Sequence, residues 1–492
     1  MTSESLSPDS RTLPPALRIF TSVISGIGSN LLLAAMGAVV IGTMTRSLGA
    51  SSYGVFLTAL NITSIIGLVT DLGINSITGR EISKNPSLAS EILGTNLAMR
   101  ITLNILLVPV SALFSAQVSH AGLTLGIWLM AFSLPFDSAR IVAASAYVSS
   151  IKNHIPAILA TLRQGIFVIG VIGAVATHRG VDGCFEAYFS STLACGVAAH
   201  FIAQREVRFK PLIKFHLWLT LVKQSIHLGL IQVINLLYLK ADILLIGALS
   251  SNRLVGIYGV AYAVVTLFSV IPSTFMTAML PLLSRASDNE FKILVSRSVQ
   301  WMCFLSALIL VGIINFGRVV LYVFAGKNFF EAYVPLVLLS IGAIFTFMNA
   351  AFGFASVAKD SHRKLWVVSL LGLAINILAN LWVIPRYGLT GAAGVTLATE
   401  ILTLWGVKRN FETTLGLRVP LLQKFASATL CIGLASGTTF WLFGRESGYS
   451  SMTLLSALFA VAVFLFSATV LKLLPDGVAR VIRTRVFGET KS

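Results

Sequence analysis

Two apolar runs near the middle of the chain constrain its fold more than any other feature. They lie in the stretch 238–285, and the short polar turn Ser250–Leu254 joins them. Each run is close to the ~20 residues that cross a bilayer, and a crossing segment must satisfy its backbone hydrogen bonds internally. Both runs are therefore predicted to be transmembrane helices. The first carries Lys240 and Asp242 at a depth where a charge is energetically costly, so each side chain is expected to have either a charged partner or a functional role.

The composition extends this prediction to the whole chain. Of the 492 residues, 56% are apolar and 11% are charged, whereas a soluble domain has about 25% charged residues. The chain is predicted to be an all-α membrane protein with about 14 transmembrane helices. They are placed at 21–43, 55–78, 97–117, 122–148, 157–177, 183–203, 224–249, 256–282, 295–316, 333–357, 364–385, 389–407, 424–443 and 451–474. Pro135 and Pro272 are expected to kink the fourth and eighth of them.

The connections between these helices alternate in charge. Most cations lie in every second connection, for example the one with Arg80, Lys84 and Arg100 and the basic connection 204–223. The intervening connections carry one or two cations each, such as Arg253. By the positive-inside rule, the basic connections and both termini face the cytoplasm. This distribution explains most of the formal net charge of +17 without a nucleic-acid partner.

Three landmarks recur at an offset of about 202–208 residues and predict an internal repeat. Gly54-Val55-Phe56 recurs as Gly256-Ile257-Tyr258, Lys152 and His154 recur as Lys359 and His362, and Gly180–Gly183 recurs as Gly388–Gly391. We therefore expect two pseudo-symmetric six-helix lobes around a central cavity, plus two C-terminal helices. The predicted parts are a cytoplasmic N-terminal segment (1–20), the first lobe (21–203), a basic cytoplasmic connection (204–223), the second lobe (224–407), two additional transmembrane helices (408–474) and a cytoplasmic basic tail (475–492).

The sequence offers little that would support catalysis. Gly326-Lys327-Asn328 is the nearest approach to a phosphate-binding loop, and it lacks the loop itself. There is no HExxH or CxxC motif, and the four cysteines fall inside apolar runs, where they are expected to be small core residues. We predict neither a catalytic residue nor a metal site, and we do not expect an enzyme.

Two acidic positions in the first lobe lie at membrane depth. Asp71 either belongs to a helix-end network with Arg80 and Glu81 or faces the cavity. Asp137 and Arg140 are spaced i,i+3 on one helix, so they share a face and neutralise each other. If this pair lines the cavity instead, Arg140 is also placed to contact phosphate.

Three further ionisable residues lie in the second lobe. Lys240 and Asp242 are two residues apart and point about 200° away from each other, so they cannot pair within their own helix. Each either lines the cavity or forms a buried ion pair with another helix. Glu400 has no cation at i±3 or i±4, so burial favours its protonated form. It is our candidate for coupling to a proton or a sodium ion, and no other cofactor is expected.

Three stretches carry a family resemblance. Residues 50–84 resemble the opening of the polysaccharide biosynthesis proteins, the Wzx-type flippases of lipid-linked oligosaccharides. Residues 240–285 are similar to the seventh and eighth helices of that family, and NILANLWVIPRYGLTGAAGVTLATE (376–400) to its eleventh and twelfth. The family shares a superfamily with the multidrug and toxin extruders and the peptidoglycan-precursor flippases.

The resemblance implies a flippase of the cell inner (plasma) membrane. It would move undecaprenyl-diphosphate-linked oligosaccharide repeat units from the cytoplasmic to the outer leaflet, for O-antigen, capsule or exopolysaccharide assembly. A polysaccharide polymerase and a chain-length regulator are the protein partners that this role implies. The alternative is a cation-coupled multidrug exporter of the same superfamily. A membrane-embedded glycosyltransferase is a weaker alternative, because the outer connections are too short to hold a catalytic site.

Overall fold

The computed structural model describes residues 15–116, 121–149, 154–361, 365–443, 451–471 and 473. Over these ranges, every regular element is an α-helix or a short 3-10 helix, which confirms the all-α prediction. Ten helical stretches are long and apolar enough to cross a membrane, so the chain is a multi-pass membrane protein. The predicted cytoplasmic tail (475–492) and Lys152, His362 and Arg445 lie outside the described residues.

The helices follow one another with short connections. The first half of the chain forms α1 (Pro15–Asp71), α2 (Ile74–Lys84), the 3-10 helix η1 (Pro86–Leu88), α3 (Ala89–Ala116), α4 (Ala121–Ser149), α5 (His154–Ala176) and α6 (Gly180–Ala203). The second half forms α7 (Phe215–Leu249), α8 (Asn252–Phe268), α9 (Val270–Arg285), α10 (Asp288–Ala325), the 3-10 helix η2 (Lys327–Ala332), α11 (Tyr333–Ala358) and α12 (Leu365–Leu415). The described part ends with α13 (Leu422–Phe443) and α14 (Ser451–Val470).

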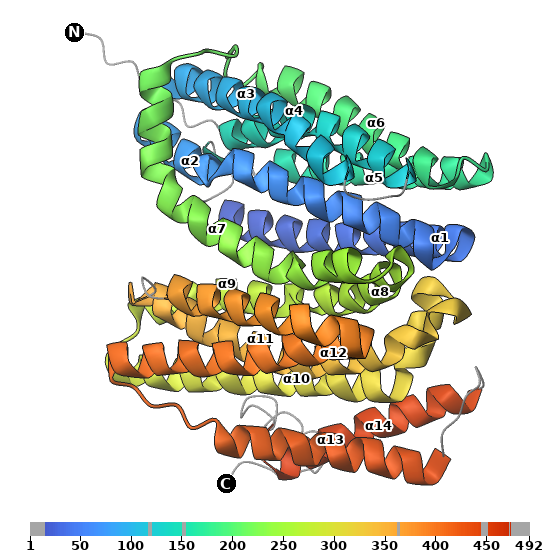
Figure 1. The fold of residues 1–492 in the computed structure, drawn as a ribbon. Helices are drawn as coiled ribbons and strands as arrows, with labels where there is room; N and C mark the ends of the chain where they lie inside the picture. The colour runs from blue at the N-terminus through green and yellow to red at the C-terminus, as the bar shows by residue number, and fades with distance from the viewer. Residues whose placement is uncertain are drawn as a thin grey trace.

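Two of these helices are each divided by a glycine. α1 bends at Gly49 (φ 80°) and α12 bends at Gly388 (φ 54°), positive φ values that glycine adopts without a Cβ penalty. Each therefore contains two straight segments that correspond to two neighbouring predicted helices. Figure 1 shows α1 turning back on itself at this bend. The total of fourteen crossings stays a prediction, because the described residues give ten candidate stretches, two of which contain a bend.

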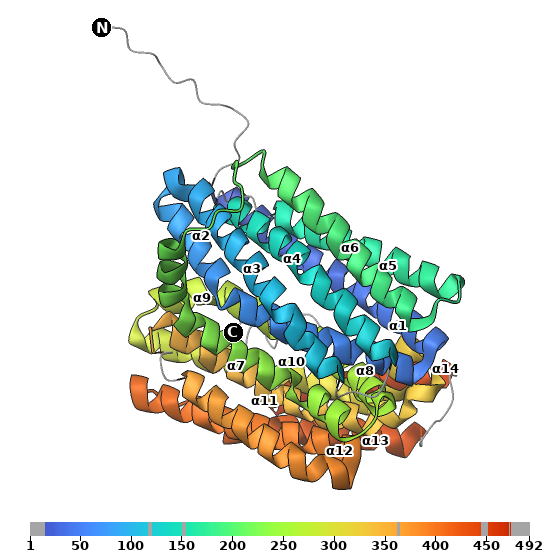
Figure 2. The same ribbon diagram turned by 45° about the horizontal axis from the view of Figure 1, so that its top comes forward.

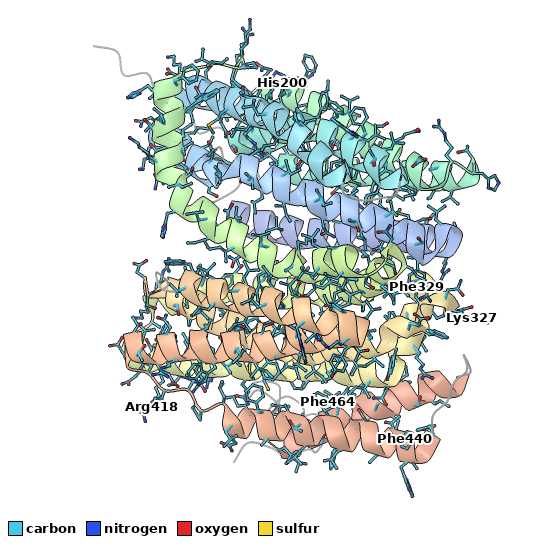
Figure 3. The ribbon with its side chains drawn as sticks, viewed as in Figure 1. His200, Lys327, Phe329, Arg418, Phe440 and Phe464 are labelled. Carbon is cyan, nitrogen blue, oxygen red and sulfur yellow. The ribbon has the colours of Figure 1, made fainter. Side chains whose placement is uncertain are left out.

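The helices run roughly alongside one another and give the bundle two ends (Figures 1 and 2). We call one the basic end, where the connections 204–214 and 358–361 lie, and the other the Arg253 end, where the α7–α8 turn and η2 lie. Figure 3 shows Arg418 at the basic end and Lys327 at the Arg253 end. α7 is strongly curved, and it packs against α1 and α2 as well as against α12. α13 and α14 lie on the outside of the second half, against α10.

The predicted eighth helix is broken in the structure. α8 ends at Phe268 and α9 begins at Val270. The break lies close before Pro272, whose nitrogen has no hydrogen to donate to the carbonyl of Phe268. The kink expected at this position is therefore a helix boundary. α4, in contrast, continues unbroken through Pro135.

The repeated glycine landmarks have matching local structure. Gly180 and Gly388 both have positive φ, and each is followed directly by a helical segment that starts at the Arg253 end. Gly54 and Gly256, the other repeated pair, lie against each other where α1 crosses α8. One apolar core around them joins both halves, with Phe56 of α1 and Tyr258 of α8 among its members. The four cysteines are buried and free, as predicted.

Candidate functional site

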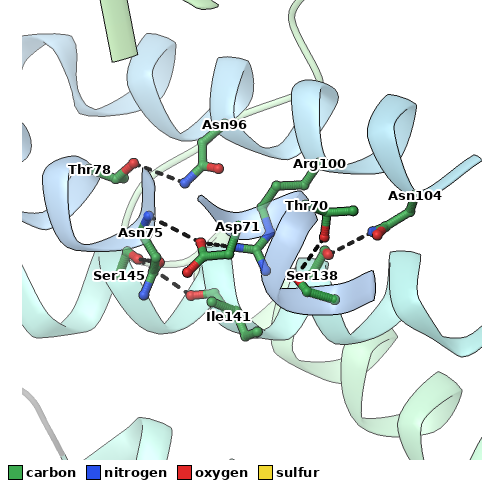
Figure 4. Close-up of polar contacts among 11 residues, drawn as sticks. Thr70, Asp71, Asn75, Thr78, Asn96, Arg100, Asn104, Ser138, Ile141 and Ser145 are labelled. Carbon is green, nitrogen blue, oxygen red and sulfur yellow. Dashed lines mark hydrogen bonds and ion pairs between the residues drawn. The ribbon is translucent and has the colours of Figure 1, made fainter. Parts of the chain in front are cut away.

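Asp71 lies where α1 ends, at the start of a polar group shared with α2, α3 and α4. The helix stops because Leu72 and Gly73 adopt left-handed backbone angles, with φ of 43° and 73°. The Asp71 carboxylate pairs with the guanidinium of Arg100 from α3, and it accepts a 3.3 Å hydrogen bond from the Asn75 backbone N–H. Figure 4 shows both contacts. The predicted network with Arg80 is wrong, since Arg80 contacts Glu81 and Gln224 instead.

Arg100 corrects another sequence-based prediction. The charge pattern groups it with the cations of a cytoplasmic connection, although it lies three residues inside the predicted third helix (97–117); in the structure it lies well within α3, which begins at Ala89. Arg100 is therefore enclosed between helices and is only 2% exposed. Its Nε has no hydrogen-bond partner among the described residues. Polar contacts continue on both sides of it, as Asn96 donates to Thr78 and Asn104 donates to Ser138, each at 2.9 Å.

The Asp137–Arg140 pair is present as predicted. Both Nε and Nη2 of Arg140 lie 2.8 Å from Oδ1 of Asp137. The two side chains are 21% and 31% exposed, for Arg140 and Asp137 respectively, so the pair is partly open to its surroundings. Asp137 also interacts electrostatically with Arg163 and Arg100.

Arg163 on α5 is a residue that our sequence analysis overlooked. Its guanidinium lies 5.8 Å from the ring centroid of Tyr188 on α6. No carboxylate lies within 4 Å of it among the described residues, in contrast to Arg100 and Arg140. Among the described residues, the helices of the first half thus bring together three guanidinium groups (Arg100, Arg140, Arg163) and two carboxylates (Asp71, Asp137), and these five groups have an excess of one positive charge. We call these five residues the arginine cluster. The sequence feature that could have revealed Arg163 is its position as a lone cation inside the predicted helix 157–177.

Asp242 is buried at the interface of α7, α8 and α12, and all its described partners are neutral. It is 4% exposed. Its carboxylate accepts hydrogen bonds from Tyr258 at 2.9 Å, from Asn380 at 2.8 Å and from the hydroxyl of Thr396. The side-chain amide of Asn380 also donates a 3.2 Å hydrogen bond to Oδ1 of Asn376. The buried ion pair that we considered for Asp242 is not formed within the described part of the chain.

Glu400 on α12 forms a second polar contact between α7 and α12. It is 8% exposed, accepts a 3.0 Å hydrogen bond from Tyr238 and contacts Asn349 at 3.4 Å. Tyr238 and Asp242 are four residues apart on α7, as Thr396 and Glu400 are on α12, so the two helices meet through two successive polar contacts. Its own helix places no cation at i±3 or i±4, and no cation from another helix pairs with Glu400 among the described residues. We call Asp242 and Glu400 with their neutral donors the carboxylate pair.

The internal repeat differs at this site. Phe56 occupies the position that Tyr258 holds in the second half, and it packs against the rings of Phe167 and Phe185. It has no hydroxyl, whereas the hydroxyl of Tyr258 binds Asp242. Lys240 lies on another face of α7 and is half-buried. Neither an acceptor nor a carboxylate contacts its ammonium group in the described residues, so its charge is not neutralised locally.

One cavity of about 530 Å³ lies at the Arg253 end. It is lined by α1 next to its bend, the first turn of α8 and η2, with Ser51, Arg253, Lys327 and Glu331 among the lining residues. Arg253 and Glu331 form an ion pair of 2.6 Å there. None of the six predicted site residues lines this cavity. Among the described residues, no group of histidine, cysteine, aspartate and glutamate is arranged to hold a metal ion.

Comparison with solved structures identifies the fold. The chain superposes on the lipid II flippase MurJ in an inward closed conformation with a TM-score of 0.73, covering 92% of this chain and 98% of that one at 13% identity. A multidrug resistance MATE family transporter in an inward-facing conformation gives a TM-score of 0.63, with 80% and 99% covered at 11% identity. The chain therefore has the fold that these transporters share.

Comparison of sequences identifies the family. The probable low-salt glycan biosynthesis flippase Agl15 of Haloferax volcanii is 21% identical over 393 residues, 77% of this chain and 79% of its own length. The probable flippase AglR of the same organism is 26% identical over 171 residues, 34% of this chain and 36% of its own. The profile of the polysaccharide biosynthesis protein family matches residues 43–334, more than half of the chain. The chain is therefore a member of the polysaccharide biosynthesis protein family.

Proposed function

We propose that this protein is a flippase for an oligosaccharide linked to an isoprenoid diphosphate, with undecaprenyl as the carrier. It moves the repeat unit from the cytoplasmic to the outer leaflet of the inner membrane, with both termini in the cytoplasm. Family membership and the two Haloferax relatives support the class of reaction. The observation that carries the proposal is the division of charge between the two halves. The arginine cluster has an excess of positive charge, and the carboxylate pair has no cationic partner within the described part of the chain.

The arginine cluster suits the diphosphate. A diphosphate carries about two negative charges, and guanidinium groups bind phosphate oxygens through several fixed N–H donors. Arg163 is the member free of a carboxylate, and the partly exposed Arg140 is the member that can exchange Asp137 for phosphate. Lys240 adds a further cation from α7 that has no partner among the described residues. These cations offset the cost of bringing the anionic headgroup to membrane depth.

The carboxylate pair suits a coupling cation. A buried ionised carboxylate without a counter-ion is unfavourable, so binding of a proton or a sodium ion lowers the free energy of this site. Sodium prefers oxygen ligands, and the carboxylate of Asp242 lies beside the hydroxyl oxygens of Tyr258 and Thr396. Binding and release of such an ion would change how tightly α7 holds α12. We propose that this change drives the transport cycle, with Asp242 and Glu400 as the ion-binding residues.

A deletion strain tests the proposed function against the exporter alternative. Without the protein, lipid-linked repeat units should accumulate on the cytoplasmic leaflet, and the supply to the polymerase and its chain-length regulator should stop. Uptake of a fluorescent cationic dye should be unchanged. Higher dye accumulation with normal polysaccharide output would instead identify a drug exporter.

A further inference from the structure

The second segment of α1 makes a backbone-to-backbone contact with α8 at the Arg253 end. A Cβ atom built on Gly54 would lie 1.7 Å from the carbonyl oxygen of Asn252, and one on Gly256 would lie 2.0 Å from that of Ala50. Both obstructing atoms belong to the main chain, so a rotamer change cannot remove the overlap. This crossing is possible only because both repeated positions are glycine.

The same part of the chain makes a second glycine contact at the basic end. A Cβ on Gly229 of α7 would lie 2.3 Å from the carbonyl oxygen of Leu72, and one on Gly73 would lie 2.9 Å from the nitrogen of Gly229. Arg80 supports this contact by donating a 3.2 Å hydrogen bond to Gln224 of α7. The backbone between α1 and α2 thus approaches that of α7 here, somewhat less closely than α1 approaches α8 at the other end.

Arg46 supports the contact at the Arg253 end. Its guanidinium donates to the carbonyl oxygens of Tyr322 and Val323, at 2.9 and 2.7 Å. Both carbonyls belong to the last turn of α10, where the helix dipole favours a cation, and that of Tyr322 also accepts the Gly326 N–H at 3.0 Å. A residue of the first half therefore caps a helix of the second half.

The two glycine contacts are separated by about the thickness of a bilayer. Gly54 and Leu72 are 18 positions apart along nearly continuous helix, which corresponds to about 27 Å at 1.5 Å per residue. The hydrocarbon core of a bilayer is about 30 Å thick. One contact therefore lies near each membrane face.

We infer that Gly54–Gly256 and Leu72/Gly73–Gly229 are the two gates of the transporter, both closed in this structure. This inference rests on the proposed function, in which the headgroup enters from one face and leaves at the other. Release at the Arg253 end requires α1 to separate from α8 and Arg46 to leave α10. Entry at the basic end requires α1 and α2 to separate from α7. Opening the Arg253 end must also part buried side chains that pack beside the two glycines, such as Tyr53 of α1 and Val255 of α8.

Thiol labelling of the full chain in membranes tests each gate separately. The reporters are Asn61→Cys, two helical turns from Gly54 on the same face of α1, and Ser225→Cys, one turn from Gly229 on α7. Both positions are buried, at 1% and 0% exposure. A membrane-impermeant maleimide is applied from one face at a time, and the native cysteines, which are buried, are measured without a reporter as background.

Gly256→Ala should raise labelling at position 61 by about tenfold, a factor that corresponds to about 1.4 kcal/mol against the closed contact. It should leave position 225 unchanged. Gly229→Ala should do the reverse, from the opposite face. Gly247→Ala is the matched control, because its Cβ would meet nothing closer than 3.5 Å, and it should change neither reporter.

A second variant keeps the test decisive if the alanine variants fail to fold. Arg46→Gln introduces no overlap and should raise labelling at position 61 alone. If both Gly256→Ala and Arg46→Gln leave that position unreactive, or if each variant opens both reporters equally, the gate assignment is wrong. Labelling needs no substrate. A failed gate assignment is therefore distinguishable from a failed flippase proposal, which the deletion strain tests.

Discussion

Arg163 offers the sharpest prediction about the arginine cluster. Arg100 and Arg140 are each paired with an aspartate, whereas Arg163 lies over the ring of Tyr188 and has no carboxylate within 4 Å among the described residues. Its charge is therefore available to an anionic ligand. A hydrogen bond to a charged group contributes about 1.5–3 kcal/mol, so Arg163→Gln should weaken binding of an isoprenyl diphosphate roughly tenfold to a hundredfold.

Asp137→Asn should act in the opposite direction. It removes the carboxylate that holds Arg140 through two contacts of 2.8 Å, and so it frees a second guanidinium. Binding should then become tighter by a similar factor. Arg163→Lys should retain part of the affinity, because it keeps the charge without the planar fork.

The assay is titration of the purified protein in nanodiscs with farnesyl diphosphate, a short water-soluble isoprenyl diphosphate. Arg179→Gln is the matched control: Arg179 is 61% exposed and pairs with Glu186 at the Arg253 end, so its loss should not change the Kd. A Kd within twofold of wild type for Arg163→Gln, or weaker binding by Asp137→Asn, would refute the reasoning.

Three further predictions concern other parts of the chain. Lys240→Ala should lose most of the transport while the protein still inserts, and Lys240→Arg should keep part of it; wild-type flipping by the alanine variant in vesicles would reduce the lysine to a structural role. Glu400→Gln should remove the dependence of transport on pH without abolishing lipid binding, as measured by flipping across a pH series; an unchanged pH profile would exclude Glu400 from coupling. A reporter enzyme that is active only outside the cytoplasm should be active when fused at Arg253 and silent when fused near Lys210, and a silent fusion at Arg253 would overturn the orientation.

The sequence predicted the features of the fold that depend on local pattern. Hydrophobic length and the requirement for internal backbone hydrogen bonds predicted the helices, and Pro272 marked the break between α8 and α9. The Asp137–Arg140 contact was predictable because i,i+3 spacing on a helix brings two side chains together. The glycine repeat could be recognised in the sequence, but the contact between its members Gly54 and Gly256 could not.

The remaining contacts depend on tertiary packing. Asp71 and Arg100 are 29 residues apart, and nothing local pairs them. Arg100 was grouped with a connection because a cation near the start of an apolar run is typical of one, although the predicted helix 97–117 already contained it. Asp242 is solvated by donors 16 to 154 residues away, so no window of sequence could show that its partners are neutral.

The central claim is that this chain moves a lipid-linked oligosaccharide, and reconstitution tests it most directly. The purified protein is placed in sealed vesicles that contain an undecaprenyl-diphosphate-linked oligosaccharide, and arrival of the glycan at the opposite leaflet is followed with an impermeant lectin. We predict transfer by the wild-type protein, slower transfer by Arg163→Gln and no uptake of a cationic dye into the same vesicles. Transport of the dye without any movement of the glycan would contradict the proposed function.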